Sequence, residues 1–124
     1  MKSVLLIMLL GSLGVLTRYL IDQKLAPNQG SAFPLSTFSI NIVGSVLIGF
    51  LFVLCNEKAL IQKELGLALM TGFLGGFTTF SAYSLQSLFL IQEGHIQIAL
   101  LYFISSPLIG ILGAWLGILT GRLI

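Results

Sequence analysis

The residues best suited to bind ions lie in the stretch "GFLGGFTTFSAY", residues 72–83 of this 124-residue chain. Its glycines weaken a helix, and Thr78 and Thr79 are β-branched. A helix break inside an apolar segment leaves backbone carbonyls that only protein, water or an ion can satisfy. Such carbonyls are good ligands for a hard cation such as sodium. We therefore expect an interrupted helix with a backbone cation site.

Two aromatic side chains follow these threonines. Phe80 and Tyr83 are one helical turn apart, so they share a face. Aromatic rings have electropositive edges, which can face an anion. The alternative is ordinary aromatic packing beside a glycine hinge, and the residues alone leave both interpretations open.

A second set of polar residues lies between positions 34 and 55. Thr37, Asn41 and Ser45 recur every four residues and so occupy one helix face. Polar side chains in a membrane span usually face protein or water. Asn41 is therefore expected either to make an interhelical hydrogen bond or to line a pore.

Two further polar features lie in the first and last apolar segments. Tyr102, Ser105 and Ser106 form a patch followed by Pro107, which removes a backbone donor and predicts a kink. Arg18 is the one charge inside an apolar run. It is expected either to reach the headgroups or to pair with an acidic residue one turn later, Asp22.

The elements that must position these residues are membrane helices. The chain is 56% hydrophobic and 8% charged, whereas soluble domains carry about 25% charged residues. An all-α integral membrane protein is therefore expected, as a single four-helix domain over residues 1–124. A span needs about 20 apolar residues, and four segments qualify: 3–25, 34–55, 65–91 and 96–123. The first resembles a signal peptide but is too long, so we interpret it as a span.

The remaining composition excludes several classes of protein. No basic cluster suggests nucleic acid, and no nucleophile–base set or metal cluster suggests an enzyme. Glycines three or four residues apart predict closely packed helices, as in "GSLG", "GSVLIG" and "GILGAWLG". Lys and Arg are only slightly in excess on the side that would carry both ends of the chain, which favours one orientation weakly.

The chain resembles the Fluc/CrcB family of fluoride channels. The similarity covers nearly the whole sequence and is carried by "GSLGVLTRY", "PLSTFSINIVGSVLIG" and "GFLGGFTTFSAYS", in that order. It implies a multi-pass protein of the plasma or inner membrane that exports fluoride passively. It also implies an antiparallel, dual-topology homodimer with two pores and a third helix broken within the membrane.

The resemblance assigns roles to individual residues. A structural sodium ion at the dimer centre would bind the backbone carbonyls of Gly75 and Thr78, and Arg18 matches a first-span arginine. The fluoride pore would be lined by the following side chains: Asn41, Phe80, Tyr83, Ser81, Thr37, Tyr102 and Ser106.

Three positions depart from the usual pattern of the family. Tyr83 replaces a phenylalanine, Ala82 a frequent threonine and Gln86 a frequent glutamate. The Tyr83 hydroxyl is expected to be able to donate to fluoride, which would bind the ion more tightly and slow its exit. Two alternatives stay open: a degenerate subunit of a heterodimeric channel, and a proton-coupled fluoride transporter. The transporter would normally need an acidic residue or histidine inside a span, and none is seen mid-span.

Overall fold

All regular structure in the described part of the chain is helical. The structure, a computed structural model, describes residues 2–25 and 32–124. Four helical segments are long and apolar enough to cross a membrane, which confirms the all-α, four-span part of the expected fold class. The first is α1 (Lys2–Leu25) and the last is α6 (Ile96–Leu123).

The two middle segments are composite. The second consists of α2 (Leu35–Phe52) and a π-helical turn, η2 (Val53–Glu57). The third consists of α3 (Lys63–Leu67), the π-helix η3 (Ala68–Leu74), the short α4 (Gly75–Phe77) and α5 (Phe80–Gln92). π-Turns often occur at functional sites, and η3 leads directly to the ion-binding candidates.

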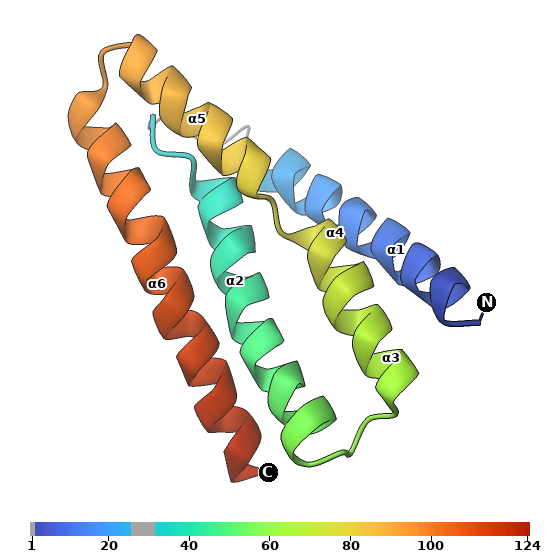
Figure 1. Ribbon diagram of the computed structural model, residues 1–124. Helices are drawn as coiled ribbons and strands as arrows, with labels where there is room; N and C mark the ends of the chain where they lie inside the picture. Colours follow the sequence, from blue (N-terminus) through green and yellow to red (C-terminus); the bar gives the residue numbers. More distant parts are fainter. Residues whose placement is uncertain (1, 26–31) are drawn as a thin grey trace.

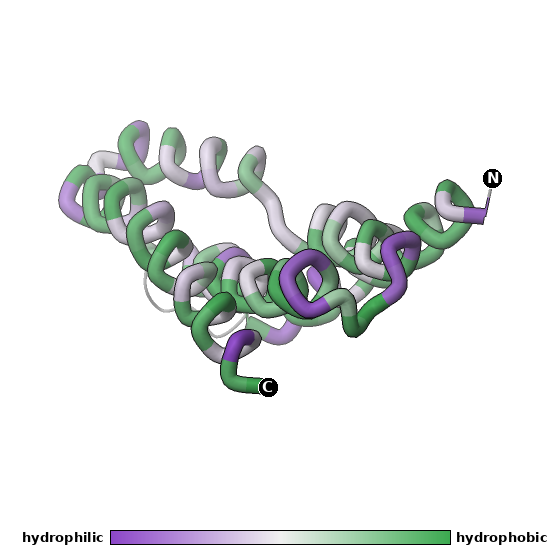
Figure 2. Tube along the Cα trace, turned by 60° about the horizontal axis from the view of Figure 1, so that its bottom comes forward, coloured by the Kyte–Doolittle hydropathy of each residue, from purple (hydrophilic) through white to green (hydrophobic). Residues whose placement is uncertain are grey.

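The helices pack in two groups, which meet where α2 lies against α1, η3 and α4 (Figure 1). α2 and α6 lie side by side along most of their length, whereas α1 packs along η3 and α4. α5 continues away from α4 and contacts α6. Hydrophilic residues gather mainly at the turns and helix ends, while the helix bodies are apolar (Figure 2). This distribution suits a bundle whose middle lies in lipid.

The helix contacts depend on glycine, as the spacing of small residues predicted. A Cβ atom on Gly14 of α1 would overlap the carbonyl oxygen of Phe73, and one on Gly117 of α6 would overlap that of Val46. Side chains at these positions would push the helices apart. The close approach brings the backbone of α1 against the segment that carries the candidate cation site.

Candidate functional site

The backbone leaves the helical conformation at two threonines between α4 and α5. Thr78 has φ −83° and ψ 157°, and Thr79 has φ −149° and ψ 113°. Both values are extended, a conformation that β-branched residues favour. Helical turns precede and follow this pair directly, so α4 presents carbonyl groups and α5 presents amide groups at the same interruption.

Asn41 of α2 clasps the backbone of Thr79 with both ends of its amide. Its Nδ2 donates to the Thr79 carbonyl at 3.1 Å, and its Oδ1 accepts from the Thr79 amide at 2.9 Å. In an unbroken helix the Thr79 amide would donate to the carbonyl of Gly75. The clasp therefore diverts that donor and leaves the Gly75 carbonyl without its helical partner.

Thr79 is also the N-cap of α5. Its Oγ1 accepts from the amide of Ala82 at 3.2 Å and lies 3.3 Å from the hydroxyl of Ser81. An unbroken helix would pair the Ala82 amide with the carbonyl of Thr78, so this carbonyl too loses its helical donor. The hydroxyl of Thr78 turns back to the carbonyl of Leu74, at 2.9 Å.

Arg18 of α1 reaches the same interruption. Its Nε donates to the carbonyl of Gly76 at 3.2 Å, the group that would otherwise accept from the amide of Phe80. Asp22 instead accepts from the hydroxyl of Ser36 at 2.5 Å. Within the described ranges, Arg18 has no carboxylate within 4.0 Å. Its contact is therefore with the broken segment, not with the acidic residue one turn later.

A groove of about 550 Å³ opens beside the interruption, between α2, α6 and the α4–α5 link. Among its lining residues are six of the predicted site residues: Asn41, Gly75, Thr78, Phe80, Tyr83 and Ser106. The remaining lining is mostly apolar, with Gly44, Ser45 and Thr79 among the smaller or polar members. The Ser106 hydroxyl is buried and has no hydrogen-bond partner among the described residues.

The two predicted aromatic residues differ in their surroundings. Phe80 is 79% exposed, whereas Tyr83 is buried at 9%. Their ring centroids are 5.6 Å apart. The Tyr83 hydroxyl donates to the carbonyl of Phe103 on α6 at 3.0 Å. In this structure its proton is therefore engaged by α6.

Thr37 and Tyr102 lie outside the groove lining and belong to a separate buried network. Gln86 of α5 donates through Nε2 to the Thr37 hydroxyl at 2.8 Å, and its Oε1 accepts from the Tyr102 hydroxyl at 3.0 Å. Thr37 is 4% exposed and Tyr102 is fully buried. The three residues link α2, α5 and α6 through side chains alone.

The sequence placed Thr79 at the helix break and Gln86 among the departures from the family, but it did not predict the hydrogen bonds by which both hold other site residues in place. The position of Thr79 directly before a helix could have identified it as an N-cap. Gln86 offered no comparable signal, because its partners Thr37 and Tyr102 are distant in the sequence.

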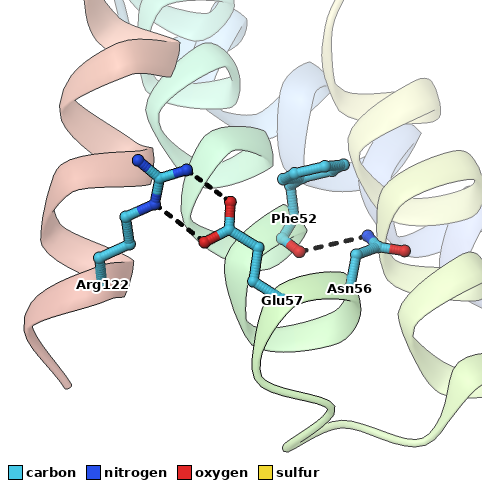
Figure 3. A network of polar contacts seen from close by, with 4 residues as sticks. All are labelled: Phe52, Asn56, Glu57 and Arg122. Atoms are coloured by element: carbon cyan, nitrogen blue, oxygen red, sulfur yellow. Dashed lines mark hydrogen bonds and ion pairs between the residues drawn. The ribbon is translucent and has the colours of Figure 1, made fainter.

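An ion pair joins the ends of the second and fourth segments (Figure 3). Neither partner is among the residues that line the groove. Arg122 contacts both carboxylate oxygens of Glu57, at 2.7 and 2.9 Å. Lys58 donates to the carbonyl of Arg122 at 3.2 Å. These groups are at least partly exposed, so the pair contributes little stability despite its bidentate geometry.

Comparison with known proteins gives one consistent result. The family described as "CrcB-like protein, Camphor Resistance (CrcB)" matches residues 5–118. The fluoride-specific ion channel FluC of Magnetococcus marinus is 40% identical over 92% of this chain and 93% of its own length. The protein of the same name from Geotalea daltonii is 37% identical over the whole of both chains. That from Coxiella burnetii is 40% identical over 97% of this chain and 98% of its own.

Proposed function

The chain belongs to the CrcB family, whose curated relatives are fluoride-specific ion channels, and we propose that fluoride crosses along the groove beside the α4–α5 interruption. The protein is a multi-pass membrane channel for fluoride and not an enzyme. Passive flow down the gradient lowers the fluoride concentration on the cytoplasmic side. The membrane is the plasma or inner membrane of the cell.

The observation that carries the proposal is the clasp between Asn41 and Thr79. One N–H of the Asn41 amide donates to the Thr79 carbonyl, and the second remains for an ion in the groove. The amides of Phe80 and Ser81 begin α5, where the helix dipole favours anions. The ring edges of Phe80 and Tyr83 add a weakly electropositive wall. Together these groups replace part of the hydration shell that fluoride must lose.

A second copy of the chain, inserted in the opposite orientation, would complete the pathway. The groove is open in one chain, and Phe80 is 79% exposed at its edge. A Cβ atom on Gly75 would meet nothing within 4 Å, so packing within the chain does not require this glycine. Close contact with a partner subunit explains both features. Each antiparallel homodimer would then contain two pores, lined by both subunits.

The carbonyls of Gly75 and Thr78 fit the predicted sodium site. Each has lost its helical donor, to Asn41 and to Thr79 respectively, and both lie at the C-terminal end of a helical segment, where the dipole favours cations. Two such carbonyls from each subunit would provide oxygen ligands of the kind that bind sodium in other interrupted membrane helices. A bound sodium ion would supply a positive charge that offsets the negative ends of these carbonyl dipoles.

An efflux experiment on the chain expressed alone tests the proposed function. Liposomes loaded with fluoride and chloride should release fluoride electrogenically, on addition of a potassium ionophore, and should retain chloride. No release from correctly folded protein would contradict a homodimeric channel, and rescue by a second family member would indicate a heterodimer. Electroneutral release that follows a proton gradient would instead indicate a proton-coupled transporter.

Sodium dependence is measured separately. Replacing sodium by N-methylglucamine on both sides should lower the thermal stability of the purified protein and its fluoride efflux. Potassium at the same ionic strength is the control for a non-specific salt effect. Equal stability in all three salts would contradict a structural sodium ion while leaving the channel itself intact.

A further inference from the structure

The carbonyl that accepts the Tyr83 hydroxyl is one that α6 cannot satisfy by itself. Phe103 lies four residues before Pro107, which is inside α6. Proline has no amide proton, so the Phe103 carbonyl lacks its normal helical donor. The Tyr83 hydroxyl occupies this position, at 3.0 Å. The tyrosine on α5 and the proline on α6 are therefore two parts of one hydrogen-bonding arrangement.

This bond also determines how the Tyr83 ring is held. On the α6 side, the ring lies against Phe103, at 6.4 Å and nearly parallel, and against Tyr102, at 5.2 Å. The ring also lies near that of Phe80, at 5.6 Å, and Phe80 is largely exposed at the groove. A phenylalanine would keep these ring contacts but would lose the bond that fixes the tilt of the ring and the distance between α5 and α6.

From these contacts we propose that Tyr83 is a positioning residue, whose hydroxyl anchors its ring to the carbonyl freed by Pro107 and is not a ligand for fluoride. The ring, which is among the residues that line the groove, is then held in a fixed orientation, because its hydroxyl end is tied to α6. The part of this inference that concerns ion flow rests on the proposed channel function. The structural coupling between Tyr83 and Pro107 does not.

A double-mutant cycle on stability tests the coupling directly. Tyr83→Phe in the wild-type background leaves the Phe103 carbonyl without a donor inside an apolar bundle. The unfolding equilibrium in a denaturing-detergent titration should shift by about tenfold, as for loss of one buried hydrogen bond. In the Pro107→Ala background, residue 107 supplies its own amide to that carbonyl. Tyr83→Phe should then shift the equilibrium by less than about threefold, because the carbonyl keeps a donor.

The same four proteins are compared for fluoride efflux as a function of fluoride concentration. A positioning role predicts that Tyr83→Phe lowers the maximal rate when Pro107 is present and has little effect when residue 107 is alanine. A hydroxyl that binds fluoride predicts a different result: Tyr83→Phe would change the half-saturating concentration by the same factor in both backgrounds. If Tyr83 has a purely structural role, Tyr83→Phe would lower stability and leave both the maximal rate and the half-saturating concentration unchanged.

Two matched controls separate these effects from general ones. Tyr19→Phe removes a hydroxyl on α1 that accepts from Gln23 at 3.0 Å, and Pro34→Ala removes a proline at the N-cap of α2. Tyr19→Phe should show no coupling to Pro107→Ala, and Tyr83→Phe should show none to Pro34→Ala. Equal shifts for Tyr83→Phe in both backgrounds would overturn the inference. Absence of fluoride efflux from the wild type would contradict the channel function without affecting the stability cycle.

Discussion

Replacing Asn41 by aspartate separates the two roles that the structure gives this side chain. An aspartate keeps an oxygen that can accept from the Thr79 amide, as Oδ1 of Asn41 does at 2.9 Å. Its second oxygen replaces Nδ2, which donates to the Thr79 carbonyl at 3.1 Å. Two acceptors would then face each other, and a negative charge would stand where the proposed pathway needs a donor.

The two consequences of Asn41→Asp have different magnitudes. Losing the bond to the Thr79 carbonyl costs about 1–3 kcal/mol of stability, because a buried carbonyl is left unpaired. A fluoride ion about 4 Å from the carboxylate would be repelled by about 4 kcal/mol at an effective dielectric constant of about 20. Since about 1.4 kcal/mol corresponds to a factor of ten in rate, fluoride efflux should fall about a thousandfold.

The assay is fluoride efflux from liposomes at pH 7 and at lower pH. Protonation of the introduced carboxyl removes its charge, so part of the flux should return as the pH falls. Asn56→Asp is the matched control, because Asn56 is exposed and its Nδ2 donates to the Phe52 carbonyl (Figure 3), and neither residue lines the groove. If folded Asn41→Asp protein conducts within threefold of wild type at pH 7, Asn41 does not line the pathway.

Three other changes test the packing around the interruption. Gly44→Ala should be destabilising, because its methyl group would overlap Cγ2 of Thr78, whereas the next-nearest atoms lie at 3.5 Å and beyond; adding Thr78→Ser removes that methyl contact and should restore most of the lost melting temperature. Arg18→Met frees the Gly76 carbonyl that the guanidinium holds. In an unbroken helix this carbonyl accepts from the Phe80 amide, so hydrogen exchange at that amide should slow locally, whereas general destabilisation would make exchange faster throughout. Arg122→Gln breaks an exposed ion pair and should leave the midpoint of a denaturing-detergent titration nearly unchanged.

Hydropathy was sufficient to predict the four spans, because about 20 apolar residues in succession have few structural solutions other than a membrane helix. Glycine spacing likewise predicted close helix contacts, and Gly14 and Gly117 show them. Local composition also pointed to Thr78 and Thr79, where the backbone is extended. These features depend on residues that are neighbours in the sequence or on one helix face.

The contacts that organise the site could not be predicted in the same way. Asn41 and Thr79 are 38 residues apart, and Gln86 and Thr37 are 49 apart. Which carbonyl or hydroxyl each amide meets depends on the register between helices, which periodicity does not determine. The Tyr83 hydroxyl illustrates the difference: the sequence suggested a donor to fluoride, whereas the register of α5 against α6 gives it the Phe103 carbonyl.

The distribution of satisfied backbone groups itself indicates where ions would bind. An unpaired amide or carbonyl in the bilayer core costs several kcal/mol, so a membrane helix is interrupted only where other groups compensate. Asn41 satisfies both backbone groups of Thr79, and Arg18 satisfies the carbonyl of Gly76. The carbonyls of Gly75 and Thr78 and the first amides of α5 are left beside one open groove. Acceptors attract a cation and donors attract an anion, and for this reason we propose that one interruption both holds sodium and lies beside the fluoride pathway.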